Sequence, residues 1–100
     1  MTQISLALDV GTTAIKAAAF DSAGRMVADT AAPASDMRGP AGENEQDMEG
    51  VWNAVADCLR GIAKAVDPTL ITSLGICAQG DGFWPLDADF QPVRPAILWS

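Results

Sequence analysis

The sequence contains no histidine, which excludes His-based catalytic triads and the usual zinc sites within these residues. Its two cysteines, Cys58 and Cys77, lie in apolar patterns and not at the spacing of metal ligands. We therefore expect both thiols to be reduced and buried. Only six basic residues accompany thirteen acidic ones, and the net charge is -7. A chain with so little positive charge has no basic stripe with which to bind nucleic acid or an anionic membrane.

The N-terminal apolar run lacks the positively charged start of a signal peptide, and Asp9 and Lys16 interrupt it. It is also too short to span a membrane, so a cytoplasmic protein is the simplest interpretation. Hydrophobic residues make up 49% of the 100 residues and charged residues 19%. This composition predicts a packed core in one domain or in part of one.

Three short strands are predicted in the first third of the chain, at residues 4–9, 13–20 and 25–30. Ile4, Leu6 and Leu8 share one face of the first strand, and Asp9 lies on the other. A glycine follows the first strand, and an Asp-Ser-Ala-Gly turn signal follows the second. Two tight turns between three short strands indicate an antiparallel meander.

A helix is predicted after a loop over residues 31–46. Asp47 is a favourable N-cap, and the helix is expected to run to about Val66, before Pro68. One apolar stripe, which places Trp52 in the core, contains Met48, Val51, Trp52, Val55, Cys58, Leu59, Ile62 and Val66.

The apolar residues 71–78 predict a strand that is buried on both faces and parallel to the first. Beyond it, a short strand at 83–86, a turn at 87–90 and a strand at 96–99 are expected. The order β-β-β-α-β indicates an α/β fold with a mixed sheet.

The turn after the first strand contains the first candidate site. Asp9 can hold Mg²⁺, and Gly11 lets backbone N–H groups approach phosphate oxygens. Thr12 and Thr13 add hydroxyl donors, and Lys16 could supply a cation near a transferred phosphoryl group. The alternative interpretation is an ordinary hairpin with a solvated lysine, and no Walker loop is present.

A second candidate site follows the predicted buried strand, where ligands bind in α/β sheets. Gln79, Gly80 and Asp81 form a polar loop there that could bind vicinal hydroxyls of a small polyol, and a plain turn is the alternative. Trp84 and Trp99 could stack on a sugar or a base. For the acidic run at 45–47 a helix cap is the favoured interpretation.

Taken in order, these motifs resemble the N-terminus of the FGGY carbohydrate kinases, a family with xylulose, ribulose, glycerol and erythritol kinases among its members. The matching positions are Asp9, Gly11, Thr12, Thr13, Lys16, Glu45, Gln46, Asp47, Gly75, Ile76, Gln79, Gly82, Leu86, Asp87, Pro95 and Trp99. Glu43 and Met48 stand where the family usually has an aromatic residue and a proline.

The resemblance implies an actin-like ATPase (ribonuclease H-like) fold, of which residues 1–100 are the N-terminal portion of the first domain. It implies ATP and Mg²⁺ as cofactors, with Asp9 facing the metal. The implied phosphate ligands are Gly11, Thr12, Thr13 and Lys16, and the implied substrate ligands are Gln79, Gly80 and Asp81. The second domain and the general base are expected downstream of residue 100.

The implied reaction of the full-length protein is transfer of the ATP γ-phosphoryl group to a hydroxyl of a ketopentose or polyol. The Gly80-Asp81 pair resembles the L-xylulose and erythritol kinase branches. Residues 1–100 alone are expected to be inactive, to need the remainder of the kinase chain, and to self-associate through uncovered edges. Two alternatives remain, namely a nucleotide-switch ATPase of the actin or chaperone type and a non-catalytic assembly module.

Overall fold

The computed structural model describes residues 2–35 and 44–100 of the chain. Its elements are β1 (Ile4–Val10), β2 (Ala14–Phe20), β3 (Met26–Pro33), β4 (Glu45–Gln46), α1 (Met48–Ala65), a 3₁₀ turn (Pro68–Leu70), β5 (Ile71–Ala78) and β6 (Ala96–Ile97). None of the helices in these two ranges is long and apolar enough to cross a membrane.

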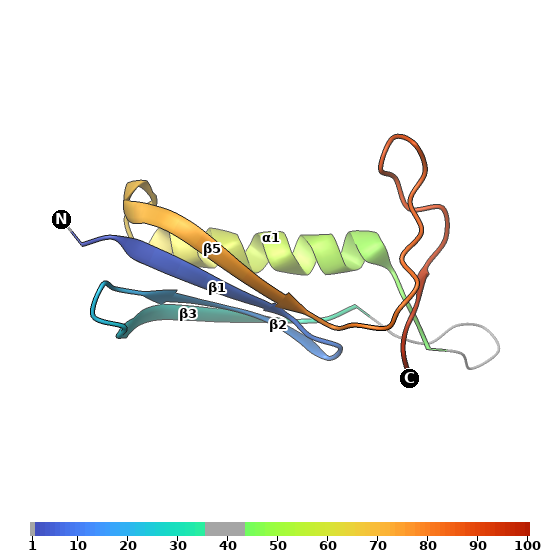
Figure 1. The fold of residues 1–100 in the computed structure, drawn as a ribbon, viewed down its shortest axis with the longest axis horizontal. Coiled ribbons are helices and arrows are strands. Elements are labelled where there is room, and N and C mark those ends of the chain that lie inside the picture. The colour runs from blue at the N-terminus through green and yellow to red at the C-terminus, as the bar shows by residue number, and fades with distance from the viewer. Residues whose placement is uncertain (1, 36–43) are drawn as a thin grey trace.

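Four strands form one mixed sheet in the order β3-β2-β1-β5 (Figure 1). β1, β2 and β3 pair antiparallel, which confirms the predicted meander. β5 pairs parallel with β1, as predicted, because α1 carries the chain back across the sheet before β5 begins. The α/β class and the β-β-β-α-β order are therefore confirmed for the main sheet.

The core lies between α1 and one face of the sheet, where the helix packs on β2 and β3. Its buried members are Ile4, Leu8, Ile15, Ala17, Ala19, Val51, Ala54, Val55, Cys58 and Ile62. The helix begins as predicted, because the Asp47 carboxylate accepts the N–H of Gly50 at 3.0 Å. It ends at Ala65, before Pro68, which cannot continue it.

The expectation that β5 is buried on both faces is wrong. Seven of its eight residues are exposed, including Ile76 and Cys77. The physical reason is the place of β5 in the sheet. It is an edge strand, whereas α1 packs on β2 and β3, toward the opposite edge. The buried thiol expected at residue 77 is therefore an exposed one, whereas that of Cys58 is buried as expected.

The core position expected for Trp52 is also wrong, because 61% of this residue is exposed. Successive helical residues are rotated by about 100°, so Val51 and Trp52 cannot both point at one flat sheet. Val51 belongs to the buried core, whereas Trp52 does not pack in it. The apolar stripe read from the sequence is wider than the surface that the described sheet covers.

The loop expected over residues 31–46 contains more structure than predicted. β3 continues to Pro33, and Glu45 and Gln46 form β4, which pairs with Ile97 and Ala96 of β6. The middle of the expected loop, residues 36–43, lies outside the described residues.

The C-terminal segment after β5 extends from one end of the sheet (Figure 1). The strand expected at 83–86 reduces to two isolated bridges, Phe83 with Ile97 and Leu86 with Pro92. The turn expected at 87–90 is present, and the strand expected at 96–99 is the two-residue β6. Trp84 is partly buried against the core.

The turn between β2 and β3 is closed by Asp21. Its carboxylate accepts the N–H of Arg25 at 2.9 Å and that of Ala23 at 2.9 Å, and it pairs with the Arg25 guanidinium. The backbone hydrogen bond from Arg25 is the largest cause that lowers the pKa of Asp21 below its ordinary value.

We expect this carboxylate to stabilise the fold in a pH-dependent way. A depressed pKa in the folded state adds stability above the ordinary pKa, and that stability is lost as the pH falls through the lower folded value. An NMR pH titration should find the Asp21 carboxyl below its ordinary range, and Asp21→Asn should remove that part of the pH dependence of unfolding. A midpoint at or above the ordinary value would contradict the expectation.

Candidate functional site

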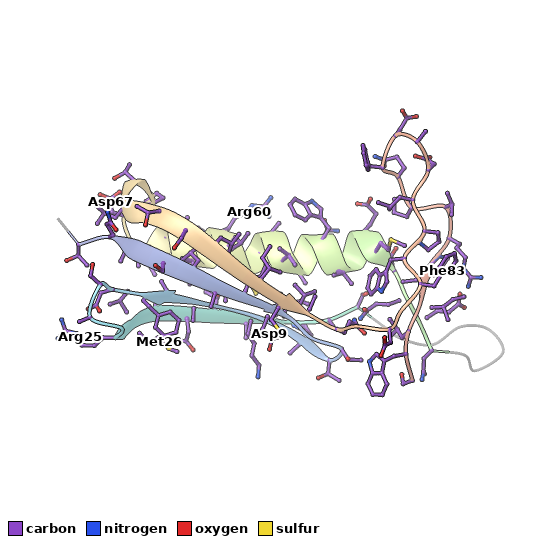
Figure 2. The ribbon with its side chains drawn as sticks, viewed as in Figure 1. Asp9, Arg25, Met26, Arg60, Asp67 and Phe83 are labelled. Atoms are coloured by element: carbon purple, nitrogen blue, oxygen red, sulfur yellow. The ribbon has the colours of Figure 1, made fainter. Side chains whose placement is uncertain are left out.

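The functional residues predicted from the sequence gather where β1 and β5 end. Because these strands are parallel, their carboxyl ends lie at the same end of the sheet, which is where open α/β sheets bind ligands. A hollow of about 430 Å³ lies there, lined by Asp9, Gly11, Thr12, Cys77, Ala78, Gln79, Gly80, Asp81 and Trp99. Figure 2 shows Asp9 toward the end of the sheet from which the segment with Phe83 departs, and Arg25 and Asp67 at the other end.

Asp9 is exposed near the end of β1, on the face of the sheet opposite Leu8 and the helix. Its neighbours across the strands are Lys16 in β2 and Cys77 in β5. Among the described residues it forms no ion pair. The carboxylate is therefore open to solvent, beside the loop at 79–81, and available to a cation.

The turn between β1 and β2 presents unpaired backbone donors. The N–H of Gly11 is used within the turn, where it donates to the carbonyl of Ala14 at 3.1 Å. The next two N–H groups, of Thr12 and Thr13, donate to no group in the described ranges 2–35 and 44–100. Consecutive free N–H groups in a tight turn form a concave anion site, as in many phosphate-binding loops.

A side chain at position 11 would prevent this turn. A Cβ there would lie 2.8 Å from the carbonyl oxygen of Ala14, which is closer than carbon and oxygen can approach. The glycine is therefore required by the close approach of the two strands.

The loop after β5 is fastened to this turn. The backbone N–H of Gln79 donates to the carbonyl of Val10 at 3.1 Å, and its side chain donates to Gln46 at 3.0 Å. Asp81 has a φ of 57°, a left-handed conformation that aspartate tolerates better than most residues. Asp81 is exposed, and a Cβ at Gly80 would meet no atom within 4 Å, whereas one at Gly82 would lie 2.6 Å from Nε1 of Trp84.

Two predicted phosphate ligands do not line this hollow. Thr13 is exposed beside it, and Lys16 lines a neighbouring hollow of about 690 Å³ on the open face of the sheet. That second hollow has a floor of small side chains, including Ala7 and Ala18, and Asp9 stands between the two. Lys16 is thus next to Asp9 across the strands but on the far side from Gln79.

The acidic run at 45–47 has more functions than the helix cap favoured from the sequence. Asp47 is the cap, but Gln46 is 1% exposed and bonds to Gln79, while Glu45 pairs with Arg94. The ion pair and the pairing of β4 with β6 attach the C-terminal segment beside the hollow. They place Trp99, 60% of which is exposed, in its wall. The sequence offered one signal at Gln46, its place in the motif at 45–47, for which a helix cap was the favoured interpretation.

The mixed sheet with α1 on one face, and a polar hollow at the ends of its parallel strands, defines the first part of an actin-like ATPase fold. Residues 4–100 match the FGGY family of carbohydrate kinases, N-terminal domain. The chain belongs to this family.

Relatives of known description are sugar and polyol kinases. The chain is 33% identical over 102 residues to the L-xylulose/3-keto-L-gulonate kinase of Escherichia coli, covering 100% of this chain and 20% of that one. It is 31% identical over 99 residues to the erythritol kinase of Brucella abortus, covering 96% of this chain and 19% of that one. The crystal structure of a xyloylose kinase from Brucella ovis superimposes with a TM-score of 0.87 at 31% identity, covering 97% of this chain and 21% of that one. The chain thus spans about a fifth of the length of these relatives.

Proposed function

We propose that the full-length protein transfers the γ-phosphoryl group of magnesium–ATP to a hydroxyl group of a ketopentose or polyol. The observation that carries this proposal is one hollow with two kinds of wall. One wall is the turn with Asp9, Gly11 and the free N–H group of Thr12, and the other is the polar loop at 79–81. Family membership and similarity to L-xylulose and erythritol kinases support it.

The turn suits a metal-bound phosphate. Mg²⁺ prefers oxygen ligands and is usually held by one or two carboxylates together with the phosphates of its substrate. Asp9 offers an exposed carboxylate, and Thr12 and Thr13 offer N–H and hydroxyl donors beside it. When bound, magnesium–ATP would supply the phosphoryl group, and its Mg²⁺ ion would place a positive charge between the phosphates and Asp9. These residues would hold and orient it, with Lys16 as a further cation from the neighbouring strand.

The loop suits an acceptor with several hydroxyl groups. Asp81 accepts hydrogen bonds, Gln79 can donate and accept, and Gly80 leaves space for close approach. Trp99 provides an apolar ring face for the carbon side of a sugar. Among acceptors, L-xylulose and erythritol are the candidates that the relatives favour.

The general base that accepts the hydroxyl proton is proposed to lie in the remainder of the kinase chain, as is the adenosine site. Residues 1–100 alone should therefore release no ADP in the presence of a sugar. They should also self-associate, because β5 leaves an unpaired edge and exposed apolar side chains such as Leu74 and Ile76.

A screen of the purified full-length protein tests the proposal. Coupled ADP release should be measured with magnesium–ATP and L-xylulose, D-xylulose, D-ribulose, erythritol and glycerol in turn. The expected result is acceptor-dependent ADP release with at least one ketopentose or polyol. ATP hydrolysis that no acceptor stimulates would instead indicate a nucleotide switch.

Replacing Asp81 by asparagine should weaken the acceptor and leave the nucleotide unaffected. Asparagine tolerates the same left-handed conformation, so the change removes the charge and keeps the backbone. The KM for the acceptor should rise about tenfold, the loss of one charge-assisted hydrogen bond, with the KM for ATP unchanged. Asp89→Asn, in the exposed turn of the same segment, is the matched control and should change neither value.

A further inference from the structure

Gln46 is a buried polar residue close to the ends of β1, β3 and β5, because its side chain bonds to residues just after each of these strands. Only 1% of it is exposed, and a buried amide is stable only where its hydrogen bonds are made. Its backbone belongs to β4, which pairs with β6 in a two-stranded sheet separate from the main sheet. Its side chain reaches from this small sheet to the main one.

The hydrogen bonds of Gln46 determine which way its amide points. The Nε2 donates to the carbonyl of Ser35 at 3.2 Å and to that of Thr12 at 3.4 Å. Backbone carbonyls accept and never donate, so the amino group must face them and Oε1 must face the other way. That oxygen meets the side chain of Gln79 at 3.0 Å.

The same logic fixes the amide of Gln79. Because the oxygen of Gln46 can only accept, Gln79 must present its Nε2, and its own Oε1 is turned away. In the described part of the chain, that Oε1 is the one buried side-chain nitrogen or oxygen atom without a hydrogen-bond partner. The arrangement therefore leaves an acceptor oxygen in need of a donor, and sugar hydroxyl groups are donors.

Gln46 also orients the phosphate turn. The peptide bond between Thr12 and Thr13 is planar and trans, so its carbonyl and its N–H point in opposite directions. When the Thr12 carbonyl points inward to Gln46, the N–H of Thr13 points away from it, and that N–H has no partner among residues 2–35 and 44–100.

From these contacts we propose that Gln46 is a positioning residue of the kinase, joining the phosphate turn to the acceptor loop. It orients the Thr13 N–H through the Thr12 carbonyl, and it orients the oxygen of Gln79 through the amide pair. The inference rests on the proposed function and adds a residue that touches neither substrate. Its two effects pass through different neighbours, so they can be separated.

A double-mutant cycle in the full-length protein tests the pathway. Isothermal titration calorimetry would measure the Kd of L-xylulose and erythritol without nucleotide, and of magnesium–ADP without sugar. Gln46→Met should raise the Kd of the bound acceptor about tenfold in the wild-type background. In a Gln79→Met background it should raise that Kd less than twofold, because the amide that it orients is gone. The Kd of magnesium–ADP should rise by the same factor in both backgrounds.

Two further variants guard against loss of folding. Gln91→Met removes an exposed glutamine amide elsewhere and should change neither Kd. Gln46→Glu keeps the shape and an oxygen toward Gln79 but loses both bonds to carbonyls, so it should weaken magnesium–ADP more than the acceptor. This variant decides the question if Gln46→Met lowers the unfolding temperature.

The outcomes separate this inference from the proposed function. If the unmodified kinase binds none of the acceptors, the proposed function fails and the inference fails with it. If it binds an acceptor but Gln46→Met has the same effect on acceptor Kd with and without Gln79, Gln46 has only a structural role and the inference alone is overturned. An unchanged Kd in all Gln46 variants overturns it as well.

Discussion

If the full-length protein has the proposed kinase activity, replacing Asp9 by asparagine is expected to lower its kcat by about a hundredfold or more. Asparagine has nearly the same shape, so the change removes the negative charge beside the phosphate turn and little else. A cation or donor held at the position where negative charge develops typically contributes two to three decades of rate, or about 3 kcal/mol, and Asp9 is the proposed ligand of that cation. The Mg²⁺ concentration that gives half-maximal activity should also rise, because a neutral amide oxygen is a weaker ligand than a carboxylate.

Asp29→Asn is the matched control for this experiment. Asp29 is an exposed carboxylate in β3, and it lines the neighbouring hollow with Asp9 but not the one with Gln79. Neutralising Asp29 changes the net charge of the chain by the same amount as neutralising Asp9. Because Asp29 does not line the hollow with Gln79, the kcat of Asp29→Asn should stay within about twofold of the wild type. Equal losses in both variants would show that overall charge is responsible, and a normal kcat in Asp9→Asn would remove Asp9 from the site.

Replacing Gly11 by alanine should be the second most damaging change. The added methyl group would lie 2.8 Å from the Ala14 carbonyl oxygen, so the turn must open and its hydrogen bond at 3.1 Å must lengthen or break. The N–H groups of Thr12 and Thr13 would then lose their common direction. We expect the Kd of magnesium–ADP to rise at least tenfold, which is about 1.4 kcal/mol, when measured by calorimetry.

Gly24→Ala separates this local effect from general destabilisation. Gly24 has a φ of 81° in the turn between β2 and β3, and no atom lies within 4 Å of a Cβ placed there. Alanine in that conformation should cost about 1 kcal/mol of folding stability without touching the hollow. Its Kd for magnesium–ADP should be normal at temperatures where the protein is folded. Weak nucleotide binding in Gly24→Ala too would mean that stability, and not turn geometry, limits binding.

The parts of the fold that follow from local pattern were predictable. The alternation in β1, the turn residues before β2 and β3, and the Asp47 cap each depend on neighbours in sequence, and each is confirmed. The errors concern burial. Trp52, Cys77 and the faces of β5 are apolar or small, but they are exposed because the described sheet and helix do not reach them. Apolar character says that a side chain favours burial, and it does not say whether a covering element is present.

In the candidate site, too, local sequence indicates the residue types and tertiary structure decides which residues lie together. The pattern from Asp9 to Thr13 and the loop from Gln79 to Asp81 were both predicted as sites from residue types. That Asp9, Gly11 and Thr12 share one hollow with the loop depends on the pairing of β5 with β1. Likewise, nothing in the spacing of residues along the chain separates Lys16, which faces the neighbouring hollow, from Thr12, which lines this one.

By itself, the sequence determined the four strands of the main sheet, the helix and its cap, the glycine turn and the family, because these depend on short-range chemistry and on motif order. Only the tertiary structure decided that Gln46, far from both candidate sites along the chain, bonds to each of them. Hydrogen-bond direction is a property of atoms in space: the two carbonyls that orient this amide come from residues 12 and 35, which only folding brings together.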